Sequence, residues 1–211
     1  ILKAGGSAVD AAIATAAVLG VIYPHMTGMG GDAFWLIHDP VTGKVRHLNG
    51  GGRAVANADT SYFSSRGMSE VPFRGILPAT LTTPGAVSSW FAAHDAYGKL
   101  PVHRCLQAAM GFAKEGYPVG ERLAGWLAFV QKDVEALPGW RSVFMPNGEL
   151  PKAGSTLSNP ALARTLQAVA DGGASAFYAG EVGQSLAQFA AQNGGFFTLE
   201  DLAAQHAQWE E

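Results

Sequence analysis

Cysteine and charge are scarce in this sequence of 211 residues. A single cysteine, Cys105, rules out an intrachain disulfide framework and a metal cluster built on cysteines, and it leaves the compartment undetermined. Charged residues make up 15% of the chain, with 14 basic and 17 acidic side chains and no run of like charge. Nucleic acid and acidic membrane surfaces both require a concentrated basic patch, so we expect neither as a partner.

A long uninterrupted hydrophobic run is also missing. The most apolar stretch, AVDAAIATAAVLGVIYP, contains Asp10 and lacks a basic flank, so it predicts a core helix rather than a signal peptide or a membrane span. The first residues, ILKAGG, look like the end of a helix that begins earlier. We therefore expect residues 1–211 to be part of a longer chain, incomplete at both ends. The compartment stays open between cytoplasm and periplasm, with a slight preference for the cytoplasm.

The familiar metal and cofactor motifs are absent as well. The six histidines share no spacing that would place two of them on one helical face beside a carboxylate, and neither H-E-x-x-H nor C-x-x-C occurs. GMGGDA is not a dinucleotide fingerprint, because its glycines follow a predicted helix and precede a predicted strand. We expect no metal and no cofactor. We place His38 and His47 on strands beside a turn and the remaining histidines on helix surfaces, namely His25, His94, His103 and His206.

A complete set of residues for serine or cysteine catalysis is missing too. Ser88 and Ser89 lie in GAVSSWF, within a predicted helix rather than in a G-x-S-x-G elbow. Cys105 lies two residues from His103, and side chains two apart on a helix point in different directions. We therefore interpret both serines as structural and Cys105 as a buried, inert thiol.

Hydrophobic residues, in contrast, make up 48% of the chain, which is enough for one sizeable core. Ser7 is the predicted N-cap of a helix that extends to Val21. Residues 33–37 and 45–49 predict a hairpin of two strands. Apolar residues three and four apart predict further helices over residues 88–97, 102–116, 122–137, 158–172 and 180–192. Gly172 is the predicted stop of the fourth of these helices. Thr198 and Asp201 resemble a capping box at the start of a last helix. We predict one domain, with helices around or beside a small sheet.

The stretch GGGRAVANAD, residues 50–59, raises a separate question. Three successive glycines offer no side chain, and Arg53 follows them directly. Either another group approaches this backbone closely or the guanidinium holds a ligand. Composition and spacing do not separate these alternatives.

Several segments resemble the gamma-glutamyltranspeptidase family, in the same order along the chain. LKAGGSAVDAAIATAAVLGVIYPHMTGMGGDAFWLI is similar to the family's A-G-G-x-A-x-D-A-A helix and the G-G-G/D-x-F strand after it. TPGAVSSWFAAHDAYGKLP resembles the P-G-x-V helix and Y-G-x-x-P turn, and AAMGFAKEGYPV resembles the A-x-x-x-A-x-x-G-F/Y-x-V segment. GGASAFYAGEVGQSLAQFAAQNGGFFTLEDLAAQ is similar to the F-Y-x-G helix and the N-G-G-x-x-T-x-E-D-L stretch. The resemblance spans nearly the whole sequence.

This resemblance implies an N-terminal nucleophile hydrolase, whose precursor cleaves itself so that a new N-terminal threonine attacks an amide. Such a threonine uses its own amine as the base, which accounts for the missing triad. The implied fold is a four-layer αββα sandwich of class α+β, to which this chain supplies helices and part of the sheets. The nucleophile then belongs to a small subunit, so no catalytic residue is expected here and the chain alone should be inactive. The implied partners are that small subunit, cut from the same precursor, and a small-molecule amide.

The glycine-rich stretch departs from one family pattern. Glutathione-cleaving members carry an R-E-x-A-P segment whose arginine grips the substrate's α-carboxylate. Aligned on Ala54, this sequence has Gly51 in place of that arginine and Val55 in place of the proline. Loss of such a charge-assisted contact costs about 1.5–3 kcal/mol, which argues against tight gamma-glutamyl binding. In an extended segment Arg53 lies on the same face as Gly51.

We therefore hypothesise that Arg53 holds a smaller or differently placed anionic group, while the glycines make room for another acyl group. The alternative is that Arg53 forms a structural ion pair at the edge of the cleft. The looser G-x-G-R pattern is similar to the cephalosporin acylase-like and oxamate amidohydrolase-like branches of the family. We expect hydrolysis of a small or anionic acyl amide, with a gamma-glutamyl transferase or glutathione hydrolase, and a non-catalytic scaffold fragment, as alternatives. The candidate substrate-binding residues are Asn49, Gly51, Gly52 and Arg53.

Overall fold

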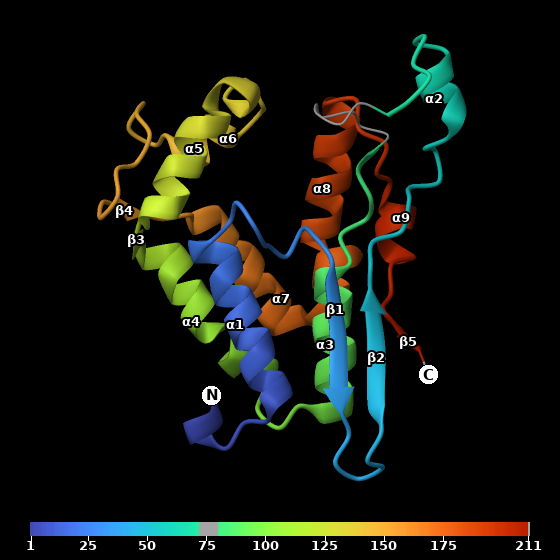
Figure 1. Cartoon of the computed structure of the whole chain (residues 1–211), viewed down its shortest axis with the longest axis vertical. Helices are drawn as coiled ribbons and strands as arrows, with labels where there is room; N and C mark the ends of the chain where they lie inside the picture. Colours follow the sequence, from blue (N-terminus) through green and yellow to red (C-terminus); the bar gives the residue numbers. More distant parts are fainter. Residues whose placement is uncertain (72–79, 211) are drawn as a thin grey trace. The chain divides into compact units, whose positions relative to one another are not determined.

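The computed structural model describes residues 1–71 and 80–210 (Figure 1). Two compact units form: a helical unit of Ile1–Gly28 and Tyr97–Asp171, and a sheet unit of Met29–Ala96 and Gly172–Glu211. The single domain expected over residues 1–211 stays a prediction. Within the described residues, no helix combines the length and the apolar character that crossing a membrane requires.

The helical unit is centred on α1 (Ala8–Ile22) and α4 (Val102–Glu115), which lie side by side (Figure 1). Ser7 caps α1 as predicted. Its Oγ accepts the N–H of Asp10 at 3.1 Å, and Oδ2 of Asp10 accepts the N–H of Ser7 at 2.8 Å, which completes a capping box. The distance between two helices depends on the side chains between them. The small side chains that both helices bury therefore favour a close approach: Ala14, Ala17, Ala109 and Ala113.

The carboxylate of Asp10 has a second structural role, because it is fully buried and accepts two further hydrogen bonds. Its Oδ2 accepts the main-chain N–H groups of Lys99 and Leu100 at 3.0 and 3.1 Å, so one side chain joins the start of α1 to the turn before α4. Cys105 is buried in α4. Its burial, together with the charge of Asp10, raises the pKa of the thiol to about 11. The prediction of a buried thiol is confirmed.

Shorter elements and two more long helices complete the helical unit. The predicted helix at residues 158–172 is confirmed with its stop at Gly172, because Gly173 has a non-helical backbone with φ of 71° and ψ of −164°, and a second helical stretch follows it. Glycine adopts this positive φ at no steric cost, which suits it to the residue directly after the predicted stop. The elements are η1 (Leu2–Ala4), β3 (Tyr117–Pro118), α5 (Glu121–Val134), α6 (Trp140–Phe144), β4 (Thr156–Leu157) and α7 (Pro160–Tyr178), whose last residues belong to the sheet unit.

The sheet unit contains a three-stranded antiparallel sheet in the order β1-β2-β5 (Figure 1). The predicted hairpin is confirmed as β1 (Ala33–His38) and β2 (Val45–Gly50). The third strand, β5 (Gln208–Glu210), was not predicted. The helices of this unit are α2 (Thr60–Ser64), α3 (Ala86–Tyr97), α8 (Glu181–Gln192) and α9 (Leu199–Ala203), the last of which begins with the predicted capping box of Thr198 and Asp201.

The two faces of this sheet differ in burial. On one face, Nε1 of Trp35 donates a hydrogen bond to Oγ of Ser89 in α3 at 3.0 Å, and Leu48 is fully buried. The opposite face carries Phe34, Leu36 and Val45, whose exposed fractions are 64%, 78% and 63%. Alternate residues of a strand point to opposite faces, so this exposed face combines those apolar side chains with His47 and Asn49 of β2.

Candidate functional site

The four candidate residues lie in the sheet unit, around the point where the chain leaves β2 at Gly50. Beyond β2 the segment 51–53 is irregular, and Ala54 then forms an isolated antiparallel bridge with Thr82. The main-chain N–H of Thr83 donates to the carbonyl of Arg53 at 2.8 Å. The segment is therefore held along one side by another stretch of backbone.

Side chains satisfy the main-chain N–H groups at the start of this segment. Gly51 donates its N–H to Oδ1 of Asn49 at 2.9 Å. Gly52 donates its N–H to Oδ1 of Asp32 at 2.7 Å, and Asp32 lies in the turn just before β1. These contacts restrict a segment that its glycines would otherwise leave flexible.

Gln205 makes the contacts that fix the end of the segment. Its side chain is buried, with 6% exposed, and it spans two residues: Oε1 accepts the N–H of Arg53 at 3.2 Å, and Nε2 donates to the carbonyl of Gly51 at 3.2 Å. The N–H of the intervening Gly52 is instead bound by Asp32. Such alternation is that of an extended chain, in which residues two apart share a face. Positions 51 and 53 therefore fit an extended arrangement, which is the condition under which Arg53 shares a face with Gly51.

The glycines are closely packed by the protein's own atoms. A Cβ at Gly50 would lie 2.5 Å from the carbonyl oxygen of Ala33 and 2.5 Å from Cβ of Ser89. A Cβ at Gly52 would overlap the carbonyl oxygen of Thr83. The expectation that these glycines make room for an acyl group is therefore wrong at Gly50 and Gly52, because the group that approaches the backbone there is another part of the chain.

Arg53 is exposed, and its guanidinium contacts one imidazole. Nη2 of Arg53 lies 3.0 Å from Nε2 of His206. In the part of the chain that the structure describes, no carboxylate lies within 4.0 Å of the guanidinium, so the alternative of a structural ion pair finds no acidic partner there. The expected helix-surface position is wrong for His206, which lies between α9 and β5, and for His25, which follows α1.

Both ends of the Asn49 amide are engaged by the protein. Its Oδ1 accepts the N–H of Gly51, and its Nδ2 donates to Oε1 of Glu210 in β5 at 2.9 Å. The other oxygen of Glu210 lies 2.9 Å from Nδ1 of His47. The hydrogen bonds from Asn49 and His47 lower the pKa of the Glu210 carboxyl. Asn49 thus supports the backbone of the segment, and its contact with a substrate stays a proposal.

Sequence reasoning missed three residues that hold this segment: Asp32, Gln205 and His206. They come from positions about 20 and 150 residues away from Arg53, so no local periodicity links them to it. A weak signal exists in both cases. Asp32 belongs to the GMGGDA turn, and Gln205 and His206 come three and four residues after the E-D-L stretch. Both of these segments carry the family resemblance.

The remaining chemistry-bearing residues have structural surroundings. The hydroxyl groups of Ser88 and Ser89 in α3 donate to the main-chain carbonyls of Gly85 and Ala86, each at 2.7 Å, and both serines are buried. This agrees with their interpretation as structural residues. Across residues 1–71 and 80–210, no group of three or more histidine, cysteine or acidic side chains is arranged to hold a metal ion.

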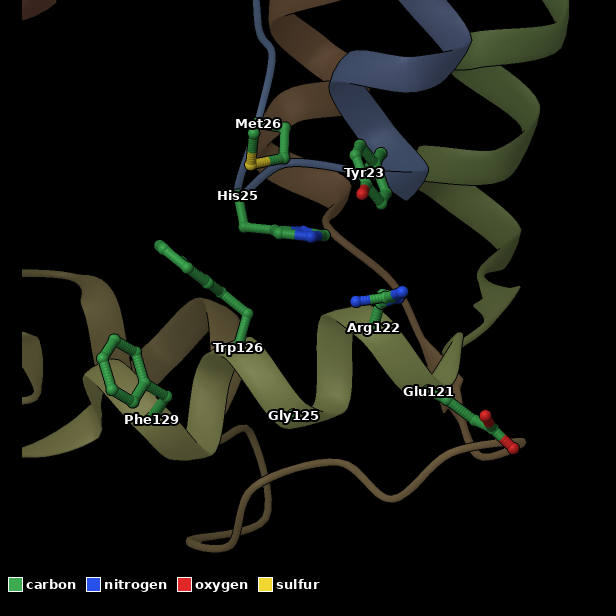
Figure 2. Close-up of a pocket in the computed structure, with 8 residues that line it drawn as sticks. All are labelled: Tyr23, His25, Met26, Glu121, Arg122, Gly125, Trp126 and Phe129. Atoms are coloured by element: carbon green, nitrogen blue, oxygen red, sulfur yellow. The ribbon is translucent and has the colours of Figure 1, made fainter.

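A separate groove of about 540 Å³ lies in the helical unit, between the segment after α1 and helix α5 (Figure 2). Its lining combines the rings of Tyr23, His25, Trp126 and Phe129 with Met26 and two charged residues of α5, and none of the four candidate residues belongs to it. In Figure 2 the guanidinium of Arg122 lies on the side of α5 that faces His25, whereas Glu121 points away. Burial lowers the pKa of His25, whose Nδ1 has no hydrogen-bond partner in the described structure.

Comparisons with known proteins place this arrangement in a family. The gamma-glutamyltranspeptidase family profile matches residues 1–211. The oxamate amidohydrolase proenzyme of Klebsiella pneumoniae is 40% identical over 98% of this chain and 39% of its own length. The glutathione hydrolase-like YwrD proenzyme of Bacillus subtilis is 37% identical over 99% of this chain and 39% of its own length. The chain thus spans about two fifths of these curated relatives.

Solved structures agree with the sequence relatives. The cephalosporin acylase from Bacillus halodurans superposes with a TM-score of 0.92 and 37% identity, over 100% of this chain and 40% of its own. The gamma-glutamyltranspeptidase from Pseudomonas nitroreducens, complexed with L-DON, superposes with a TM-score of 0.91 and 31% identity, over 100% of this chain and 62% of its own. The predicted α+β fold of the N-terminal nucleophile hydrolases is confirmed, and the chain belongs to the gamma-glutamyltranspeptidase family.

Proposed function

We propose that this chain is the large-subunit part of an autoprocessed amide hydrolase, with an N-terminal threonine nucleophile supplied by a small subunit of the same precursor. The substrate is a small or anionic acyl amide of the oxamate-like or acylase-like kind. No cofactor takes part, because a terminal threonine, an oxyanion-stabilising pair of donors and water suffice for amide hydrolysis. Asn49, Gly51, Gly52 and Arg53 form the substrate-side wall that this chain contributes, with Gly52 contributing main-chain atoms only, because Thr83 fills the space where a side chain would lie.

The observation that carries this proposal is the exposed guanidinium of Arg53 on a restrained segment. Gln205 and Thr83 hold its backbone, and His206 contacts its side chain without neutralising the positive charge. A charged donor that is already held in place binds a carboxylate at a smaller entropic cost than a mobile one. An anionic substrate group is therefore the ligand that fits this wall.

The exposed apolar residues of the sheet support the proposal that a small subunit binds this chain. Phe34, Leu36 and Val45 are more than half exposed on the side opposite α3. Neighbouring apolar side chains of this size mark surfaces that other protein elements cover. The two curated relatives described above are named as proenzymes, which fits a partner made from the same precursor.

The substrate class follows from position 51. The resemblance places the carboxylate-gripping arginine of glutathione-cleaving members at Gly51, and a glycine offers no such contact. The names of the relatives include both chemistries, because one is an oxamate amidohydrolase and another is glutathione hydrolase-like. A gamma-glutamyl transferase or glutathione hydrolase is therefore the alternative function, and a panel of substrates separates it from the proposed one.

The test uses the full-length protein. Intact-mass measurement over time should show one species becoming two, with a threonine at the new N-terminus. The processed protein should then hydrolyse oxamate or an acyl amide faster than a gamma-glutamyl anilide. Preferred cleavage of the gamma-glutamyl substrate would favour the alternative function. A protein that stays uncleaved and hydrolyses nothing would be a non-catalytic scaffold, and the proposal would be rejected.

A further inference from the structure

The side-chain contact of Arg53 with His206, at 3.0 Å between Nη2 and Nε2, joins the candidate wall to the stretch after α9. We infer that His206 is a positioning residue, which holds the guanidinium of Arg53 for the anionic end of the substrate and thereby sets specificity for that anion. The inference rests on the proposed function, because it assumes that Arg53 faces the substrate. It concerns the orientation of the Arg53 guanidinium and makes no claim about the nucleophile.

The hydrogen-bond partners of His206 assign its tautomer. Nδ1 lies 2.9 Å from the carbonyl oxygen of Ala204, and a carbonyl can only accept, so Nδ1 carries the proton. In the neutral ring, Nε2 then has a free lone pair. Nη2 of Arg53, which can only donate, lies 3.0 Å from this nitrogen. The neutral ring is therefore set up as an acceptor for the guanidinium, with the side-chain amide nitrogen of Gln208 at 3.3 Å from the same atom.

A neutral partner suits an anion-binding arginine better than an acid would. A carboxylate beside Arg53 would neutralise the charge that attracts the substrate. The imidazole restrains one N–H and leaves the net charge of the guanidinium in place. An arginine has five N–H donors, and the described structure shows a side-chain hydrogen bond for one of its nitrogens only, so other donors remain for a bidentate contact.

The position of His206 is itself fixed by contacts between two segments. Asp201 in α9 accepts the N–H of Ala56 at 2.9 Å, and Gln205 accepts the N–H of Arg53 at 3.2 Å. His206 adds the contact to the side chain of the same arginine. The stretch from α9 to β5 therefore fixes Arg53 at both its backbone and its guanidinium, which a random surface contact would not do.

The decisive experiment compares an anionic substrate with a neutral substrate of the same size, in the processed full-length enzyme. The pair is oxamate and its diamide, oxamide. His206→Leu removes the acceptor, so the KM for oxamate should rise about 5- to 20-fold while kcat and the KM for oxamide stay within about 2-fold. His206→Gln can offer an amide oxygen in place of Nε2, so it should restore most of the oxamate KM. His103→Leu, a histidine change on an exposed position of α4, is the matched control.

A double-mutant cycle separates positioning from general damage. In an Arg53→Met background, His206→Leu should change the oxamate KM by less than about 2-fold, because the group to be positioned is gone. An equal loss for oxamate and oxamide, a fall in kcat alone, or a full His206 effect without Arg53 would overturn the inference. If the enzyme cleaves only neutral amides, both the inference about His206 and the proposed role of Arg53 would be overturned.

A measurement independent of activity distinguishes failure of the inference from failure of the proposed function. Nitrogen-15 chemical shifts of the His206 ring in the full-length protein should show a protonated Nδ1 and an unprotonated Nε2, and Arg53→Met should shift Nε2. An inactive, uncleaved protein with these shifts would contradict the proposed function but confirm the contact. An Nε2–H tautomer would reject the positioning role in either case.

Discussion

The hydroxyl of Tyr178 accepts a hydrogen bond from the main-chain N–H of Ser88 at 3.0 Å, at the start of helix α3. The same hydroxyl donates to the carbonyl of Pro84 at 2.8 Å. Tyr178 is 5% exposed, and its burial raises the pKa of the phenol. One side chain thus satisfies two buried backbone groups where the chain enters α3. This is the helix to which Trp35 of the sheet donates its hydrogen bond.

Replacement of this tyrosine by phenylalanine should destabilise the protein. Tyr178→Phe leaves the N–H of Ser88 and the carbonyl of Pro84 unpaired in a buried place, which costs about 1–3 kcal/mol. Urea unfolding of the full-length protein should report this as a lower free energy of unfolding. The control is Tyr62→Phe, whose hydroxyl makes no hydrogen bond among the described residues and should change the free energy by less than about 0.5 kcal/mol. Equal effects of the two changes would show that the buried hydroxyl is not the cause.

The glycine-rich segment provides a second prediction, because adjacent glycines differ in the space around them. A Cβ at Gly52 would overlap a carbonyl oxygen of the backbone, which cannot move away without shifting the segment. A Cβ at Gly51 would lie 3.0 Å from Oδ1 of Asn49 and 3.5 Å from the ring of Phe34, and both side chains can adjust. Neither glycine has a positive φ, so sterics alone decide the outcome.

We expect Gly52→Ala to destabilise the full-length protein by about 2 kcal/mol or more and Gly51→Ala by less than about 1 kcal/mol. Thermal unfolding of both variants in parallel measures the difference. The two variants are chemically identical changes one residue apart, so each serves as the control for the other. Equal stability would mean that the packing of Gly52 against Thr83 is not maintained.

The apolar face of the sheet provides a third prediction, on whether the rest of the protein covers it. Leu36 is 78% exposed in the described chain, and Val41, in the hairpin turn, is 92% exposed. If the small subunit covers the sheet, Leu36→Glu places a charge in an apolar interface, and the full-length protein should lose about 3 kcal/mol or more of stability. Val41→Glu should change it by less than about 0.5 kcal/mol. A harmless Leu36→Glu would contradict the proposed subunit interface.

Local signals predicted much of this fold correctly. Ser7 and Thr198, each followed three residues later by an aspartate, cap α1 and α9 because capping depends on a few neighbouring residues. The β1–β2 hairpin followed from the apolar run at residues 33–37, the turn after it and the returning strand VRHLN. Strand β5 was missed because its three residues, Gln208–Glu210, have no apolar alternation of their own. They form a strand because β2 offers an edge for pairing.

The candidate site was predictable only in part, for the same reason. The sequence drew attention to the glycines and to Arg53, but it assigned the space over Gly52 to a substrate, whereas Thr83 fills it. The contacts of Gln205 and His206 join positions about 150 residues apart and depend on the folded path of the chain. Tertiary contacts of this kind carry no periodicity that a single sequence displays.

Cys105 provides the last prediction, which concerns the pH dependence of its reactivity. Its thiol pKa is raised from an ordinary value of 9.0 to about 11. At pH 8 the folded chain then holds about 100-fold less thiolate than an unperturbed cysteine would, and burial also blocks access. Because Cys105 is the sole cysteine of this sequence, labelling of this chain with a disulfide reagent such as DTNB reports on it alone.

We expect slow labelling of the native protein at pH 8 and rapid labelling in denaturant, with products assigned to this chain by mass spectrometry. The raised pKa also links to stability. The folded state holds the thiol proton more tightly than the unfolded state, so this contribution to stability is fully present below pH 9.0 and is lost as the pH rises through about 11. Cys105→Ser, which does not ionise in this range, should unfold with a smaller dependence on alkaline pH. Rapid native labelling at pH 8 would contradict both the burial of this thiol and its raised pKa.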